Sequence, residues 1–295
     1  MRNIKIVSDS TCDLSKEILE QRNIYLTPLK VCFGTETYKD LIDITTPDLY
    51  KKYQETGIVP KTAAITIDEA LEFFKELTAD GSEVIYTGIG SRLSSSYQNA
   101  VIALNELDDD ARSRVHVIDS SNLSTGIGLL VLKLCDLRDK GLSAKEIVDE
   151  ANRIIPCVRA QFAVKSLEFL HKGGRCSGTV KFFGTLLAIK LILRIFEGKI
   201  VVSDKLMTRR FEKALDYQIK DLEANLNDVD SDYLFITHSE AHEEAQYIYD
   251  HLSDEIKNKF KNIIITRAGC VISSHCGQGT VGVLYIKNKP LESDK

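Results

Sequence analysis

Short apolar runs alternate with helical patterns through the first half of the chain. The β-rich runs are residues 4–7, 25–29, 84–87 and 115–118, and the helical patterns are residues 14–22, 67–77, 95–107 and 125–140. Within residues 67–77 the apolar positions fall on one helical face, and Thr66 with Glu69 forms a capping box at the start. Strands that alternate with helices are typical of an α/β domain with a mainly parallel sheet.

The second half of the chain has a more mixed pattern. A capping box at Ser143 and Glu146 opens a predicted helix over residues 144–155, which ends at Pro156. We therefore predict two domains, an N-terminal α/β domain over residues 1–157 and a C-terminal α+β domain over residues 158–290. In the second domain the patterns predict strands at 161–164, 199–203, 233–237, 263–266 and 281–286, and helices at 208–226 and 241–252. We expect these helices on one side of a sheet.

Length and composition agree with a cytoplasmic globular protein of two domains. The chain has 295 residues, of which 43% are hydrophobic and 27% charged, and its net charge of -5 argues against broad nucleic-acid binding. Seven cysteines without a C-x-x-C pair favour reduced thiols, and the first residues become polar too early for a signal peptide. The most apolar stretch, residues 182–196, is interrupted by Lys190 and Arg194 and is too short for a membrane anchor. We expect it to form a buried wall.

A serine-rich turn lies between the predicted strand at 84–87 and the helix that follows. It contains Ser91, Ser94, Ser95 and Ser96. The backbone N–H groups at a helix start can hold a phosphate or a carboxylate, although capping of the helix is the simpler explanation for any single hydroxyl. Similar polar turns occupy residues 8–13, 60–62 and 119–124. Together the four turns favour a rim around a polar ligand group, and the absence of a Walker A or dinucleotide-binding motif means that a nucleotide is not specifically indicated.

Two glycine-containing segments of the second domain, residues 170–177 and 269–279, also carry polar side chains. Arg175 and His275 within them are suited to a bound anion, although tight turns and a surface ion pair are an equally good explanation. Cys270 or Cys276 beside His275 could be the nucleophile of an acyl hydrolase or transferase, which would also need an orienting group and an oxyanion hole.

The spacing of His238 and His242 is that of two metal ligands on a helix, but no third ligand presents itself. We therefore predict neither a metal nor a cofactor.

Taken in order, these segments resemble the DegV family, the bacterial fatty-acid-binding proteins that include the lipid-binding subunits of fatty acid kinase. Each motif is weak alone, but seven in the right order over nearly the whole chain are specific. The motifs are Asp9-Ser10-Thr11-Cys12-Asp13-Leu14, Pro60-Lys61-Thr62, Leu93-Ser94 with Tyr97-Gln98-Asn99-Ala100, Asp119-Ser120, Lys172-Gly173-Gly174-Arg175, Ile189-Lys190, and His275 with Gly277 and Gly279.

The resemblance implies a carrier that holds one long-chain fatty acid, such as palmitate, in a tunnel between two domains. It places the carboxylate on Thr62 and Ser94, with His275 nearby. We add Arg175, Ser95 and Ser96 to the predicted fatty-acid-binding residues. Ser95 and Ser96 stand where the family often has Gly-Thr, and we expect them mainly to cap the helix.

The resemblance also implies that the carrier is not itself an enzyme. A separate fatty acid kinase would phosphorylate the bound acid, and we predict that Arg209 and Arg210 form part of its docking site. Burial of about 15 methylenes at roughly 0.8 kcal/mol each would supply about 12 kcal/mol before the costs of binding. The alternatives are the cysteine-dependent acyl hydrolase or transferase, and a binding protein for another small carboxylate or phosphate.

Overall fold

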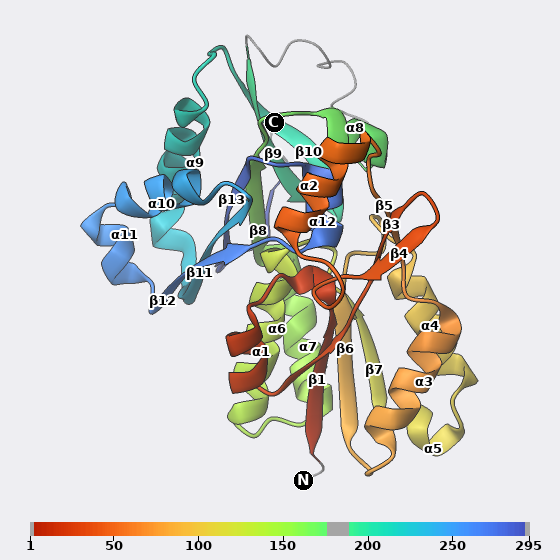
Figure 1. The fold of residues 1–295 in the computed structure, drawn as a ribbon. Helices are drawn as coiled ribbons and strands as arrows, with labels where there is room; N and C mark the ends of the chain where they lie inside the picture. The colour runs from red at the N-terminus through yellow and green to blue at the C-terminus, as the bar shows by residue number, and fades with distance from the viewer. Residues whose placement is uncertain (1–2, 176–188, 293–295) are drawn as a thin grey trace.

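The computed structural model describes residues 3–175 and 189–292, which form two large sheets and a small one (Figure 1). The first large sheet has four parallel strands in the order β2-β1-β6-β7, as the alternating pattern predicts. Its strands are β1 (Ile4–Asp9), β2 (Ile24–Thr27), β6 (Glu83–Gly88) and β7 (Val115–Asp119). Side chains on both faces of β1 are buried, because helices cover both sides of a parallel sheet.

The helices of the first half divide between the two faces of this sheet. One face carries α1, α6 and α7, and the other carries α3 and α4, with α5 at the edge (Figure 1). The bounds are α1 (Lys16–Gln21), α3 (Ile67–Thr78), α4 (Ser96–Glu106), α5 (Asp109–Arg112), α6 (Thr125–Asp139) and α7 (Ala144–Ile154). Both predicted capping boxes are present, at the starts of α3 and α7.

The second large sheet has six strands in the order β10-β9-β8-β13-β11-β12, and only β11 and β12 are parallel neighbours. Its strands are β8 (Val158–Ala163), β9 (Lys190–Phe196), β10 (Lys199–Leu206), β11 (Val229–Ser239), β12 (Asn262–Arg267) and β13 (Thr280–Lys287). One face packs against α9 (Glu212–Asn225), α10 (His242–Asp250) and α11 (Asp254–Lys259), as expected for the α+β half. The predicted boundary between residues 157 and 158 stays a prediction.

The opposite face of the second sheet packs against the first half of the chain. Buried Ile6 of β1, Leu193 of β9 and Phe235 of β11 belong to one continuous apolar core. Helix α6 contacts strands of both large sheets, so it forms part of the packing between them. The predicted apolar wall coincides in part with buried β9, and its residues 182–188 lie outside the described residues.

Besides α5, α11 and strand β9, a small antiparallel sheet and three helices are absent from the sequence prediction. They are β3 (Lys30–Phe33), β4 (Glu36–Lys39), β5 (Lys61–Ala63), α2 (Thr46–Thr56), α8 (Glu168–Gly173) and α12 (Cys270–Cys276). Thr62, predicted in a turn that leads into a helix, therefore lies in a strand, and the glycine-containing segment 269–279 contains a helix. Most of these elements are too short to show a period in sequence, and their contacts with one another stabilise them.

Candidate functional site

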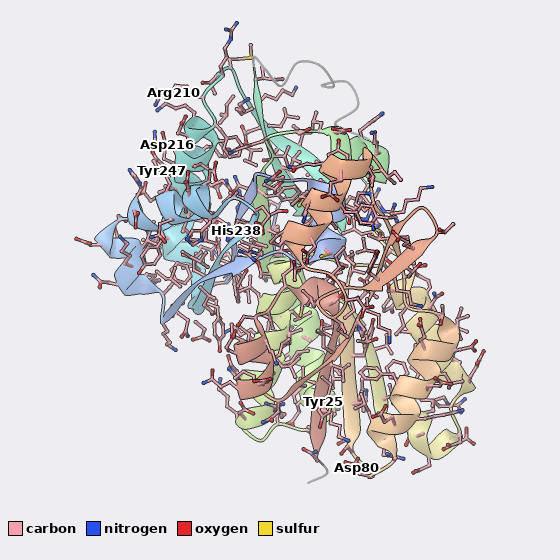
Figure 2. All side chains as sticks on the ribbon, viewed as in Figure 1. Tyr25, Asp80, Arg210, Asp216, His238 and Tyr247 are labelled. Carbon is pink, nitrogen blue, oxygen red and sulfur yellow. The ribbon has the colours of Figure 1, made fainter. Side chains whose placement is uncertain are left out.

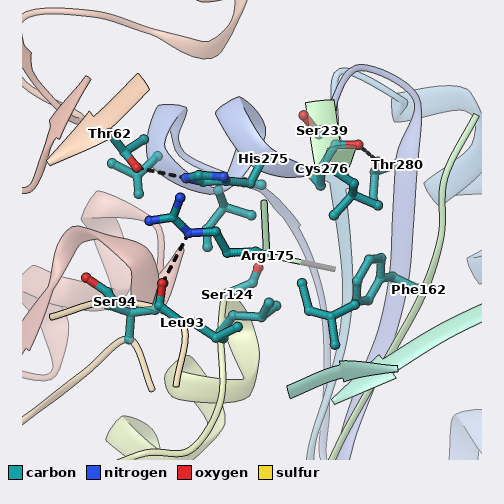
Figure 3. Close-up of a pocket in the computed structure, with 18 of the residues that line it drawn as sticks. Thr62, Leu93, Ser94, Ser124, Phe162, Arg175, Ser239, His275, Cys276 and Thr280 are labelled. Carbon is teal, nitrogen blue, oxygen red and sulfur yellow. Dashed lines mark hydrogen bonds between the residues drawn. The ribbon is translucent and has the colours of Figure 1, made fainter. Parts of the chain in front are cut away.

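A pocket lies where the carboxyl edge of the first sheet faces the inner side of the second sheet (Figure 3). The empty space of the pocket, together with its open mouth, is about 1080 Å³. Apolar side chains from both halves of the chain make up much of its wall. Six of them are Leu29, Ile89, Leu93, Phe162, Ile200 and Leu284. The pocket therefore suits a ligand with a large apolar part.

Polar side chains gather at one end of this pocket. The Oγ1 atom of Thr62 lies 2.7 Å from Nε2 of His275, so the small sheet and α12 meet there through a hydrogen bond. Arg175 donates from Nε to the carbonyl oxygen of Leu93 at 3.3 Å and from Nη1 to that of Gly173 at 2.6 Å. Figure 3 shows Thr62, His275, Arg175 and Ser94 around the same space, with Phe162 on the opposite side. On that side Phe162 stands with polar side chains, among them Ser239 and Thr280, so the pocket has one polar end and a mixed wall opposite it.

The predicted site residues largely converge on this pocket. Thr62, Ser94, Ser95, Arg175 and His275 all line it. Sequence proximity cannot account for this convergence, since these residues come from the small sheet, the turn before α4, the end of α8 and α12. The fold brings together five side chains from four separate segments.

Ser96 departs from the prediction, as does the expected capping by Ser95. Ser96 is fully buried and lies beneath Ser94, whose hydroxyl is 3.0 Å from that of Ser96, so Ser96 is not among the residues that line the pocket. Ser95 occupies the N-cap position of α4, but its side chain caps no backbone N–H. The cap bond comes instead from Ser94, whose Oγ accepts from the backbone N–H of Ser96 at 3.2 Å. Ser96 therefore lies in the interior beside the pocket and not in its lining.

His275 is neutral at physiological pH in this environment. Burial, together with the nearby positive charge of Arg175, lowers its pKa from 6.5 to about 4. Its Nδ1 atom is buried, and among the described residues it has no hydrogen-bond partner. The missing side chain of Gly173 faces that atom, because a Cβ built there would lie 2.4 Å from Nδ1. An unpaired acceptor is tolerated better than an unpaired N–H, so the geometry favours the tautomer that carries its proton on Nε2 and donates to Thr62.

The two cysteines near His275 do not have the surroundings of a nucleophile. Burial raises the pKa of Cys276 to about 12, and that of Cys270 is raised as well. The thiol of Cys270 donates to the carbonyl oxygen of Ile44 at 3.4 Å, and Nε2 of His275 bonds to Thr62. A nucleophilic thiolate needs a lowered pKa and a base within reach. The geometry therefore does not favour the acyl hydrolase alternative.

Other candidates from the sequence lie away from the polar end of the pocket. His238 lines the pocket, but its Nδ1 accepts a hydrogen bond from the backbone N–H of Ala241 at 3.2 Å and its ring packs edge-on against His242. Arg210 is exposed at the start of α9 and lies near Glu212 (Figure 2). In residues 3–175 and 189–292, no group of three His, Cys, Asp or Glu side chains is placed to hold a metal ion. Within the same ranges, none of the helices has the length and apolar character needed to cross a membrane.

The polar turns at residues 8–13 and 119–124 mainly make contacts within the protein, although Ser124 also lines the pocket. Most of their polar groups are buried and bonded within the protein. Asp13 accepts from the hydroxyl of Ser124 at 2.5 Å and from the backbone N–H of Gly269 at 2.8 Å. Ser10 donates to Asp40 at 2.8 Å. These groups hold elements together beside the pocket, whereas the sequence could not distinguish such contacts from contacts with a ligand.

Sequence reasoning missed several residues at the site, among them Phe162 and Gly173. Phe162 lines the pocket opposite the polar end, and Gly173 leaves room for His275. The glycine was visible in the Lys172-Gly173-Gly174-Arg175 motif, but the motif does not reveal what approaches it. In sequence, Phe162 cannot be distinguished from other strand residues, because the residues that line the pocket with it are distant in the chain.

Known proteins are similar to this chain in both sequence and fold. A family model described as "Uncharacterised protein, DegV family" matches residues 3–288. A DegV domain-containing protein of Clostridium acetobutylicum is 34% identical over 288 residues, covering 97% of this chain and 99% of the relative. A solved DegV family protein of Thermus thermophilus, described as fatty acid binding, has a TM-score of 0.88 at 27% identity and covers 97% of this chain and 100% of its own.

A second solved structure, a stearic acid-binding protein of Eubacterium ventriosum, has a TM-score of 0.85 at 26% identity. The match covers 98% of this chain and 99% of that one. The family model extends over nearly the whole chain, and the fold of two domains agrees with these structures. This chain belongs to the DegV family, as its motifs predict.

Proposed function

We propose that this protein binds one long-chain fatty acid and presents its carboxylate to a partner kinase in the cytoplasm, without catalysing a reaction itself. The observation that carries the proposal is the pocket, whose polar end at Thr62, Ser94 and His275 continues into a space with a largely apolar wall that includes Leu93, Phe162 and Leu284. That polarity matches a carboxylate with a long hydrocarbon tail. The descriptions of the Thermus and Eubacterium structures as fatty-acid-binding proteins support the same ligand class.

The polar end offers hydrogen-bond donors to an ionised carboxylate. When His275 donates from Nε2 to Thr62, the hydroxyl proton of Thr62 is free to point into the pocket. The hydroxyl of Ser94 lines the same end, and the guanidinium of Arg175 adds a positive charge. Hydrogen bonds to a charged group are stronger than those between neutral groups. The neutral His275 thus orients Thr62 and places no further charge beside the ligand.

The apolar wall supplies most of the affinity in this proposal. A palmitate tail of about 15 methylenes gains about 12 kcal/mol at roughly 0.8 kcal/mol per methylene, before the costs of association. The head group then sets the direction in which the acid lies. A small carboxylate or inorganic phosphate could fill only the polar end and would leave the apolar wall uncovered.

Lipid extraction from the purified protein followed by mass spectrometry tests the proposal. We expect a long-chain fatty acid to be extracted, and we expect palmitate added to delipidated protein to raise the melting temperature, because a ligand that binds only the folded state stabilises it. Octanoate is the matched control, with the same head group and a short tail. If no fatty acid is extracted and palmitate neither binds nor stabilises the protein, the proposal is wrong.

The proposed transfer to a kinase needs access to the carboxylate. Ser95 and Arg175 line the polar end of the pocket and are exposed, so this end lies at the surface. We expect a fatty acid kinase to form acyl phosphate from ATP and palmitate only when this protein is added. Arg209→Ala combined with Arg210→Ala should slow that turnover and leave palmitate affinity unchanged. Equal turnover with the double variant would remove Arg209 and Arg210 from the docking site.

A further inference from the structure

Helix α12 has two faces that contact different parts of the molecule. Val271, Ile272, His275 and Cys276 line the pocket. The opposite face carries Cys270, Ser273 and Ser274, which are buried. A helix of seven residues is only about 10 Å long, so its intrinsic stability is small and its position depends on what surrounds it.

Two buried carboxylates from the first half of the chain hold the start of this helix. Oδ1 of Asp13 accepts from the backbone N–H of Gly269 at 2.8 Å, and Oδ1 of Asp40 accepts from that of Cys270 at 2.7 Å. These are among the N–H groups that have no partner inside a helix and carry its positive partial charge. Asp13 and Asp40 therefore do in trans what an N-cap side chain usually does within its own segment.

The two carboxylates are themselves held in place. Asp40 is fully buried, and its Oδ2 accepts from the hydroxyl of Ser10 at 2.8 Å. Asp13 is 3% exposed, and its Oδ2 accepts from Ser124 at 2.5 Å. Every carboxylate oxygen of the pair thus has a hydrogen-bond donor. Burial of a carboxylate is costly, and a surface N-cap would satisfy the helix without that cost, so helix stability alone does not explain this arrangement.

The small sheet contacts both ends of α12. Asp40 directly follows β4 and holds the first turn, whereas Thr62 lies in β5 and bonds to His275 in the last turn. Both strands pair with β3, so these two side chains have a fixed separation. Between them, the hydroxyl of Tyr50 donates to the carbonyl oxygen of Ser273 at 3.2 Å. Rotation or axial movement of α12 would therefore break the bond at the pocket together with those at the helix start.

We propose that Asp13 and Asp40 are positioning residues for the head-group site, which fix α12 so that His275 meets Thr62. Neither carboxylate belongs to the pocket lining; they act through the helix. The inference rests on the proposed binding of a fatty acid and explains how a site shared by both halves of the chain keeps its geometry. It also gives a role to Asp13, a buried acidic residue of the turn 8–13 that does not line the pocket.

The test compares Asp40→Ala with Asp40→Asn in delipidated protein, measuring palmitate affinity by calorimetry. The alanine variant loses the acceptor for Cys270, and we expect palmitate to bind at least about tenfold more weakly, as for loss of a hydrogen bond to a charged group. The asparagine variant keeps an amide oxygen that can accept that bond and should recover most of the affinity. Asp108→Ala is the matched control, because it removes the N-cap bond to Ala111 of α5, far from the pocket.

A second readout separates positioning from general destabilisation and needs no ligand. The NMR titration of His275 should move from a pKa of about 4 toward 6.5 in Asp40→Ala, because a displaced α12 exposes the ring. It should not move in Asp108→Ala. In a His275→Ala background, Asp40→Ala should weaken palmitate binding little further, since the two changes remove the same contact.

The possible outcomes distinguish the two proposals. If wild-type protein binds no palmitate but its His275 titration responds to Asp40→Ala, the proposed function fails and the positioning role stands. If palmitate binds and Asp40→Ala changes neither affinity nor the His275 titration, the positioning role is wrong. If Asp40→Ala does not fold, Ser10→Ala takes its place, because it removes one donor to Asp40 and keeps the carboxylate. It must weaken palmitate binding and shift the His275 titration, both by less than Asp40→Ala would. If Ser10→Ala changes neither, the inference is overturned.

Discussion

Replacing Thr62 by valine tests the polar end of the pocket with the least change of shape. Valine keeps the branched side chain and removes the hydroxyl whose oxygen lies 2.7 Å from Nε2 of His275. Because valine favours strands at least as strongly as threonine, β5 should not be weakened. The variant therefore isolates one hydrogen bond at the proposed carboxylate site.

The expected loss follows from the charge of the acceptor. A hydrogen bond to a charged group contributes about 1.5–3 kcal/mol, and tenfold in affinity corresponds to about 1.4 kcal/mol. Palmitate should accordingly bind Thr62→Val about 10- to 100-fold more weakly than wild type. His275 loses its partner in the free and in the bound state alike, so that part of the cost largely cancels.

Calorimetry with myristate, palmitate and stearate provides the assay. Each added methylene contributes about 0.8 kcal/mol against the apolar wall, so the three acids differ in affinity while the factor lost by Thr62→Val stays the same. Thr62→Ser keeps the hydroxyl and should bind within about threefold of wild type. Wild-type affinity of Thr62→Val, or a loss that grows with tail length, would refute the placement of the carboxylate at Thr62.

Three further outcomes are expected. Phe162→Ala should shift the preference toward longer acids by about fourfold per added methylene, measured by competition, and an unchanged ranking would mean that the tail ends elsewhere. Gly173→Ala should displace His275, because the new Cβ would lie 2.4 Å from Nδ1, and should weaken palmitate binding without abolishing folding; unchanged affinity would show that the ring position does not matter. Burial raises the pKa of Asp9 to about 6 in the folded protein. Between about pH 4 and 6 the folded state therefore binds more protons than the unfolded state, so ionisation of this carboxyl group lowers the free energy of unfolding as the pH rises. Relative to wild type, Asp9→Asn should therefore gain up to about 3 kcal/mol of unfolding free energy between pH 4 and 7, and a pH-independent difference in denaturant unfolding would contradict this.

Sequence reasoning succeeded where a pattern repeats within one element. The parallel strands of the first sheet, the capping boxes of α3 and α7, and helices α9 and α10 over the second sheet follow from local periodicity and local hydrogen bonds. It failed for β5 and α12, which have three and seven residues and contact each other at the polar end of the pocket. The hydroxyls of the serine turn show the same limit, because only the tertiary packing buries Ser96 and leaves Ser94 in the pocket lining.

By itself the sequence determined the family and the α/β character of the first half. It also provided a set of predicted binding residues, five of which line the pocket. Those conclusions need only the order of motifs and the period of apolar positions, both of which can be read along the chain. Only the tertiary structure decided which polar groups remain available to a ligand. Asp13 and Thr62 are equally polar in sequence, but Asp13 is bonded to Gly269 and Ser124 whereas Thr62 lines the pocket. A side chain's role depends on the partners that satisfy it, and here those partners are more than 100 residues away.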